Sequence, residues 1–106
     1  MKQALLSYGI EEENIKVAAK TGLVVDIKGR GELVPDDQGI KMIALRCDMD
    51  ALPIPENNQD LEYKTTTSFA HMCGHDGHMT TLLACAQVVA SNRDKLPKDK
   101  TVRLLI

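Results

Sequence analysis

The hydrophobic residues of this chain form three short runs and one helical stripe. Residues 21–29, 42–45 and 101–106 are apolar runs bounded by glycine or polar residues, a pattern that predicts three strands. The run at 42–45 is nearly unbroken, which is typical of a strand covered on both faces in a parallel or mixed sheet. The run at 101–106 predicts another buried strand.

A helical spacing begins after Gly77, where apolar side chains recur every three or four positions. This spacing predicts an amphipathic helix that ends near residues 92–94, and Pro97 blocks its extension. A shorter helix is expected at residues 3–8, with Gly9 as its left-handed stop. We interpret the stripe of the longer helix as core packing; it includes Met79, Leu82, Leu83, Ala86, Val89 and Ala90.

The segments between these elements differ in character. Residues 11–14 predict an acidic, solvated turn, and residues 31–39, which contain Asp36 and Asp37, predict a hairpin-like connection. Residues 51–70 predict a long irregular surface segment, a kind of loop that is often functional. The order strand, loop, helix, strand favours an α/β fold with a mixed or parallel sheet and a helical crossover.

Composition narrows the range of functions. The chain has 106 residues, 43% of them hydrophobic, which suits one small globular domain. Its net charge of -2 gives no electrostatic footprint for nucleic acid or an anionic membrane, and no apolar run could span a bilayer. The first residues do not resemble a secretory signal, so we expect a cytoplasmic protein. Three cysteines argue against a disulfide framework, and Cys47 and Cys85 are expected to be small buried hydrophobes.

Metal-binding side chains gather in residues 71–78, where three imidazoles, one thiol and one carboxylate occupy the sequence HMCGHDGH. His71, Cys73 and His75 alternate, so an extended backbone would project all three to one side. A catalytic zinc usually takes three protein ligands and a water, and the rest of the chain has no further histidine. The segment therefore predicts part of a metal site. The alternative is a surface loop that is incidentally rich in histidine.

Two aspartates follow the strand predicted at 42–45. Asp48 and Asp50 could be solvated residues that cap the strand, which is a common position for aspartate. Because they precede Pro53 and follow a buried strand, a functional role is expected for one of them, and we choose Asp50. Glu56 could be an exposed loop acid, and its role stays open.

Three segments in this order closely resemble the amidohydrolase branch of the aminoacylase and carboxypeptidase metallopeptidases. That branch includes hippurate hydrolases and the plant enzymes that release auxin from amino-acid conjugates. The resemblance covers nearly the whole chain. The segments are TGLV at 21–24, RCDMDALPI at 46–54 together with Glu56, and HMCGHDGH at 71–78.

The resemblance implies that residues 1–106 are a partial, zinc-peptidase-like catalytic domain of a two-metal hydrolase. Its substrate would be a small N-acyl amino acid or an amino-acid conjugate, cleaved at the amide bond. Cys73 and His75 look like metal ligands, and Asp50 occupies the position of the acidic residue that supports the metal centre. Cys47 and Met72 stand where alanine is common, and neither removes a ligand. His71 and His78 are expected to flank the site.

The resemblance also implies what completes such an enzyme. Two divalent ions, whether zinc, manganese or cobalt, would activate a water and polarise the scissile carbonyl. In the family a glutamate pair follows the strand that resembles 101–106, and a dimerisation domain makes a homodimer possible. The chain stops before that pair, so we expect it to be inactive and loosely packed in isolation. The alternative is a non-catalytic fragment or pseudoenzyme module that retains only the scaffold.

Overall fold

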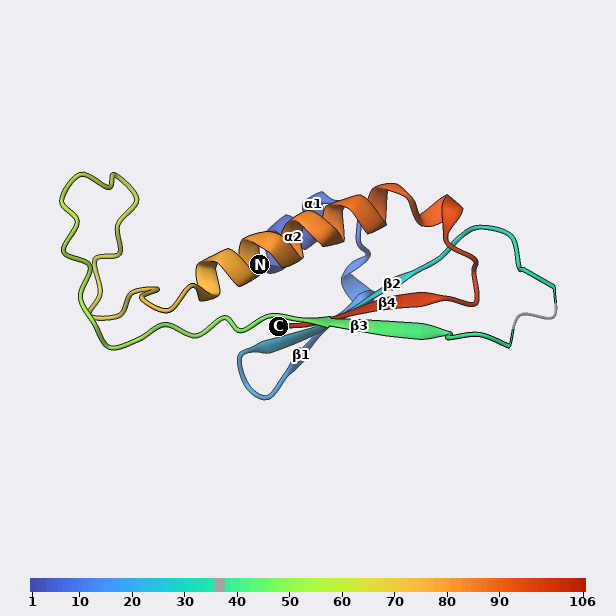
Figure 1. Cartoon of the computed structure of the whole chain (residues 1–106), viewed down its shortest axis with the longest axis horizontal. Helices are drawn as coiled ribbons and strands as arrows, with labels where there is room; N and C mark the ends of the chain where they lie inside the picture. The colour runs from blue at the N-terminus through green and yellow to red at the C-terminus, as the bar shows by residue number, and fades with distance from the viewer. Residues whose placement is uncertain (36–37) are drawn as a thin grey trace.

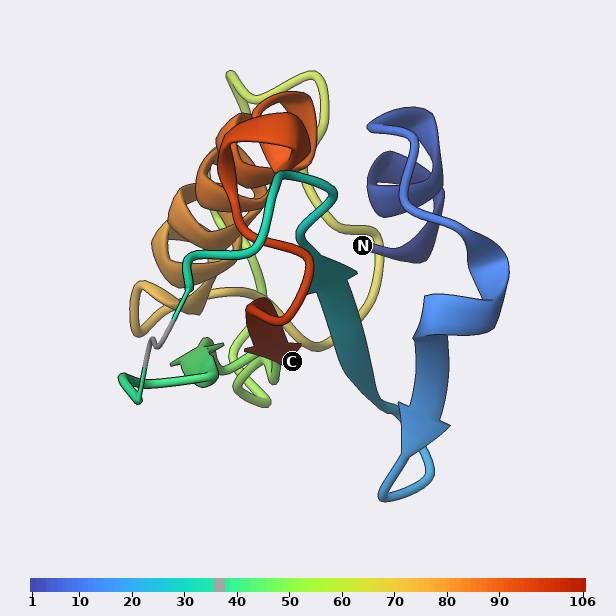
Figure 2. The same ribbon diagram turned by 90° about the vertical axis from the view of Figure 1, so that its right-hand side faces the viewer.

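The computed structural model describes residues 1–35 and 38–106. It contains a four-stranded sheet with helices on one face (Figure 1). Figure 2 shows α1 and α2 side by side above the strands. In chain order the elements are α1 (Lys2–Ser7), η1 (Glu12–Asn14), β1 (Ile15–Ala18), β2 (Gly22–Lys28), β3 (Met42–Arg46), α2 (His75–Ser91), η2 (Arg93–Lys95) and β4 (Thr101–Leu105).

The sheet is mixed, which confirms the predicted fold class. Its strand order is β1-β2-β4-β3; β2 is antiparallel to both β1 and β4, whereas β3 is parallel to β4. Parallel neighbours need a crossover connection, and α2 supplies it between β3 and β4. The predicted hairpin-like connection at 31–39 is wrong, because β4 lies between the two strands that it joins. Within it, Asp36 and Asp37 lie outside the described residues.

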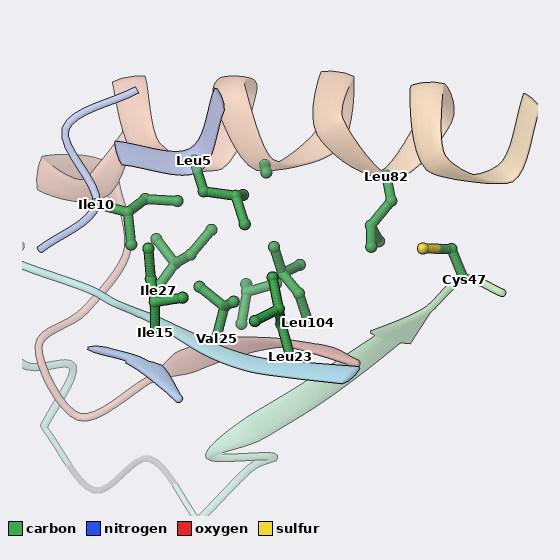
Figure 3. Packing of buried hydrophobic residues seen from close by; sticks show 11 residues of the cluster. Leu5, Ile10, Ile15, Leu23, Val25, Ile27, Cys47, Leu82 and Leu104 are labelled. Atoms are coloured by element: carbon green, nitrogen blue, oxygen red, sulfur yellow. The ribbon is translucent and has the colours of Figure 1, made fainter. Parts of the chain in front are cut away.

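Alternation along the strands builds the core. In β2 every second residue is buried, and β4 follows the same rule, because successive side chains of a strand point to opposite faces. Leu82 and Ala86 of α2 cover the buried face, so the apolar stripe predicted for this helix is confirmed as core packing. Figure 3 shows most of this cluster between helices and sheet; its members are Leu5, Ile10, Ile15, Leu23, Val25, Ile27, Cys47, Leu82, Ala86, Val102 and Leu104.

The sequence reading did not predict β1. Ile15 is buried against the core, but Val17 is 68% exposed, so the four-residue strand carries little hydrophobic signal. The turn that joins β1 to β2 holds Ala19 and Lys20 at positive φ, values of 49° and 72°. Such a conformation favours glycine. Because this turn has no glycine at these two positions, the sequence lacked the usual signal of a hairpin.

The amino-terminal helix fits its prediction. α1 ends at Ser7, and Gly9 follows with a φ of 80°, the left-handed conformation expected of a helix stop. The acidic segment after it, predicted as a solvated turn, is a short 3-10 helix that includes Glu12. Glu11, just before it, contacts η2, the short helix that follows α2: both of its carboxylate oxygens accept hydrogen bonds from Nη1 of the buried Arg93. Arg93 also donates to the Lys28 carbonyl.

Strand β3 is less covered than its composition predicted. Met42 and Ile43 are 43% and 50% exposed, because β3 is one of the two edge strands of the described sheet. Only its carboxyl end is covered, where Leu45 is half-buried and Cys47 is buried. The apolar run correctly predicted a strand, but coverage on both faces is wrong for this chain.

The long segment at 51–70 is irregular, as predicted, and extends away from the sheet (Figure 1). Leu52 and Ala70 close it at its base, since each backbone N–H donates to the carbonyl of the other at 3.0 Å. In the part of the chain that the structure describes, no helix has the length and apolar character to cross a membrane.

Candidate metal centre

The sequence motifs meet where β3 ends and α2 begins. After Arg46 the chain buries Cys47, whose side chain points toward Leu82 in Figure 3. Burial raises the pKa of the Cys47 thiol, which suits a packing role rather than a thiolate ligand. Gly74 turns the loop into α2 with a φ of 91°, a conformation that would strain other residues.

Asp48, His75 and His78 converge at this junction. One possible ligand atom from each lies within 4.8 Å of the others. The two imidazole rings are 5.4 Å apart between centroids, because residues three apart on a helix share a face. Asp48 and His75 are half-buried and His78 is exposed, so the group is open to solvent on one side. Two imidazoles and a carboxylate are a donor set that divalent transition metals accept, so these residues fit a metal ion.

His75 is held by Asp50. Its Nδ1 lies 3.0 Å from Oδ1 of Asp50 and 3.2 Å from the Asp50 backbone carbonyl. Both partners are acceptors, so Nδ1 carries a proton and donates. This tautomer leaves Nε2 as the lone-pair nitrogen of the neutral ring. A carboxylate behind an imidazole in this way fixes the ring and makes it a better metal ligand.

Asp48 has a similar partner. Nη2 of Arg46 lies 2.5 Å from Oδ1 of Asp48, and the side chain of Asp48 is 36% exposed. The ion pair orients the carboxylate, while the second oxygen stays available. Asp48 therefore presents an oxygen toward the two histidines from the end of β3.

The structure places the predicted ligand Cys73 on the surface. Its thiol is free and exposed, and it is not a member of the group that Asp48 forms with the histidines. His71 is also exposed and lines a separate cavity under the 51–70 loop, together with Glu56 and Asp76.

An open cleft of about 530 Å³ adjoins the group at the carboxyl ends of β3 and β4. It is lined by both aspartates and by the end of β4, including Ile106. A second cleft of about 510 Å³ lies between β3 and α2 and shares Asp48 and His78. The group thus lies between two open clefts, a position from which a bound ion could meet a small molecule.

The sequence prediction found part of this arrangement. It chose His75 and Asp50, which the structure brings into direct contact, and Cys73, which is free and exposed and is not a member of the group. It did not choose Asp48 or His78 as ligands. The signal was present in the spacing of the histidines, since positions three apart share a helix face. The predicted burial of Cys47 is confirmed, whereas that of Cys85 is wrong, because Cys85 is exposed on α2.

The chain is similar in sequence to several known hydrolases. Thermostable carboxypeptidase 1 of Saccharolobus solfataricus is 39% identical over 93 residues, which cover 87% of this chain and 21% of that protein. Hippurate hydrolase of Campylobacter jejuni is 42% identical over 91 residues, covering 84% of this chain and 21% of the enzyme. N-acetyl-L-cysteine deacetylase of Bacillus subtilis is 39% identical over 106 residues, covering 96% of this chain and 23% of the deacetylase. The chain therefore spans about a fifth to a quarter of the length of these relatives.

A solved structure supports the fold as well. The Bacillus subtilis YXEP protein, described as a dinuclear metal binding peptidase from the M20 family, matches with a TM-score of 0.74 and 31% identity. The match covers 99% of this chain and 26% of that one. The family model for peptidase family M20/M25/M40 matches residues 44–106, which contain the carboxyl-terminal part of β3, all of α2 and β4, and the group of Asp48, His75 and His78. The chain belongs to peptidase family M20/M25/M40.

Proposed function

We propose that this chain is the metal-binding part of a catalytic domain that hydrolyses the amide bond of small N-acyl amino acids or amino-acid conjugates. Family membership and the names of relatives, which include a hippurate hydrolase and a deacetylase, support the class of reaction. The chain covers only about a quarter of such proteins, so residues 1–106 are proposed as a partial domain.

One observation supports the proposal most strongly. The imidazole of His75 is oriented by the Asp50 carboxylate, and its ring lies next to Asp48 and His78 at the end of a strand. In an open α/β sheet, binding sites form beyond the carboxyl ends of the strands. The position of these side chains at a strand end and their ability to bind a metal ion therefore both support a catalytic site.

The proposed roles follow from the resemblance and the contacts. Cys73 and His75 are proposed as metal ligands, and Asp50 as the carboxylate that holds His75 in the productive tautomer. A pair of zinc, manganese or cobalt ions, when bound, would activate a water and polarise the scissile carbonyl. Arg46 forms an ion pair with Asp48 and so orients its carboxylate beside the cleft. The whole protein is proposed to be cytoplasmic and to form a homodimer.

The test is hydrolysis by the protein that the natural gene encodes. Purified protein is assayed with a panel of N-acyl amino acids, before and after removal of metal by a chelator and after addition of zinc, manganese or cobalt. We expect turnover that depends on metal and that His75→Ala lowers by at least about 100-fold. Turnover that survives both the chelator and His75→Ala contradicts the proposal.

The thiol ligand has a matched control. Cys73 and Cys85 are both exposed and free, so substitution by serine perturbs packing little at either position. We expect Cys73→Ser to lower turnover and metal content, and Cys85→Ser to change neither. Equal behaviour of the two variants removes Cys73 from the proposed ligands.

A further inference from the structure

We propose that the guanidinium of Arg46 binds the carboxylate of the substrate and so selects N-acyl amino acids over neutral amides. The inference deepens the proposed function by naming a residue that determines specificity, and it rests on that function for the class of substrate. It concerns a side chain that touches Asp48, not the ligands of an ion.

Arg46 is the last residue of β3, and the two clefts share it. It lines the cleft of about 530 Å³ at the strand ends and the cleft of about 510 Å³ between β3 and α2. Its side chain is 74% exposed, so a dissolved molecule can reach the guanidinium. Its Nη2 contacts Asp48, which places the guanidinium beside the group that Asp48 forms with His75 and His78.

The charges around the clefts are unequal. Among the described residues that line them, Arg46 is the only lysine or arginine. Asp48 and Asp50 line the larger of the two clefts, and their carboxylates repel an anionic substrate. A carboxylate that leaves water without a partner of opposite charge pays a large desolvation cost. Arg46 is therefore the side chain in these clefts that can neutralise it.

A guanidinium can bind two carboxylates at once. It has five N–H donors in a planar fork, and the contact with Asp48 uses Nη2. Because Asp48 already holds one side of the fork, less conformational freedom is lost when a ligand binds another side. The fork matches the paired oxygens of a carboxylate, whereas a carboxamide offers one oxygen and no charge.

The covalent structure of an N-acyl amino acid fits this arrangement. Its carboxylate carbon is separated from the scissile carbonyl carbon only by the amide nitrogen and the α-carbon. A substrate whose scissile carbonyl lies beside Asp48 and the two histidines therefore has its carboxylate within reach of a guanidinium that contacts Asp48. Leu105 and Ile106 line the same cleft and offer a surface to the apolar part of a substrate.

The experiment compares two substrates of the protein that the natural gene encodes. One is an N-acetyl amino acid, the other is the same compound with a carboxamide in place of the carboxylate, and release of acetate is measured for both. In the parent protein we expect kcat/KM to be at least about tenfold higher for the acid, the effect of a hydrogen bond between charged groups. Arg46→Gln should abolish this preference, mainly by raising KM for the acid.

Two further variants sharpen the comparison. Arg46→Lys retains the charge without the planar fork, so part of the preference should remain. Arg30→Gln is the matched control: it breaks an ion pair with Glu11, lines neither cleft, and should leave the preference unchanged. The preference is a ratio measured on one preparation, so a variant that is only partly folded still reports it.

Several results would overturn the inference. A parent protein that hydrolyses both substrates equally well does so without any variant. An equal loss on both substrates in a folded Arg46→Gln does so as well, because Arg46 then acts only by orienting Asp48. Should Arg46→Gln fail to fold by circular dichroism, Arg46→Lys decides, and an undiminished preference in that variant contradicts the proposed contact.

Failure of the proposed function looks different. If the parent protein releases acetate from neither compound, the amidohydrolase function fails and the inference fails with it. If acetate is released from both compounds without preference, only the role of Arg46 is wrong.

Discussion

The two halves of this molecule are stabilised in different ways. In the packed half, formed by α1, β2, β4 and the end of α2, side chains such as Leu5 and Leu104 are fully buried. In the metal half, residues 46–78, Tyr63 is 85% exposed and Phe69 is 52% exposed, and the site is held by a few polar contacts. Since buried apolar area is the main source of stability, the packed half stabilises the fold and the metal half is free to carry the chemistry.

The largest effect on stability should come from the centre of the packed half. Leu104→Ala removes a fully buried side chain of β4 and leaves a cavity, so we expect a loss of about 3 kcal/mol in the free energy of unfolding. Phe69→Ala, in the metal half, should change that free energy by less than about 0.5 kcal/mol. Urea denaturation of both variants measures the difference, and equal losses would contradict the division into two halves.

A smaller loss is expected where the packed half uses charge. Arg93→Ala leaves the Lys28 carbonyl and the Glu11 carboxylate without their buried donor, which should lower the free energy of unfolding by about 2 kcal/mol. The control is Lys2→Ala, which breaks an exposed ion pair with Glu12 and should leave stability unchanged. The prediction fails when both variants unfold at the same urea concentration.

The same ion pair makes stability depend on pH. A backbone hydrogen bond and the Arg93 guanidinium lower the pKa of Glu11 from 4.5 to about 2. Because the pKa is lower in the folded state, the ionised carboxylate favours folding above about pH 4.5, and this contribution is lost as the pH falls toward 2. Urea denaturation at a series of pH values should show the advantage of the parent chain over Glu11→Gln shrinking across this range. A constant difference between the two proteins would show that Glu11 is not the responsible group.

The smallest effect on stability is expected at the site itself. The side chain of Asp50 is 70% exposed, so Asp50→Asn should leave the free energy of unfolding unchanged. The asparagine can offer its amide N–H to Nδ1 of His75 and so favour the other tautomer, and we expect metal affinity to fall by about 10- to 100-fold. Calorimetry with Co²⁺ measures the affinity and urea denaturation the stability. If Asp50→Asn lowers the free energy of unfolding but leaves the metal affinity unchanged, Asp50 stabilises the fold rather than the metal site, and the division into two halves is wrong.

Much of the fold could be predicted because its signal is local. The apolar runs at 21–29, 42–45 and 101–106 predicted β2, β3 and β4, and the helical spacing predicted α2. The strand that was missed, β1, has an exposed Val17 and a turn without glycine, so no local pattern marks it. Coverage of β3 depends on which strand lies at the edge, and that is decided by pairing between distant segments.

The site was predicted in part for a similar reason. The motif at 71–78 and the aspartates after β3 were found from residue type, but the contact between Asp50 and His75 joins positions 25 apart in sequence. The sequence did not group His78 with His75, because the helix was expected to begin only after Gly77. It begins at His75, and this places both histidines in the first turn. The predicted start of α2 therefore determined whether His75 and His78 were recognised as neighbours on one helix face.

The backbone bridge between Leu52 and Ala70 fixes the distance between the ends of the intervening loop. The spacing in space between the aspartate motif and the histidine motif therefore does not depend on how long that loop is. Residues 53–69 form a loop whose two ends are held together at its base, so the number of residues in it can vary between related proteins without moving the aspartates relative to α2. This makes the loop a natural place to insert a peptide tag or reporter, and a region where relatives can diverge in length while keeping the same chemistry.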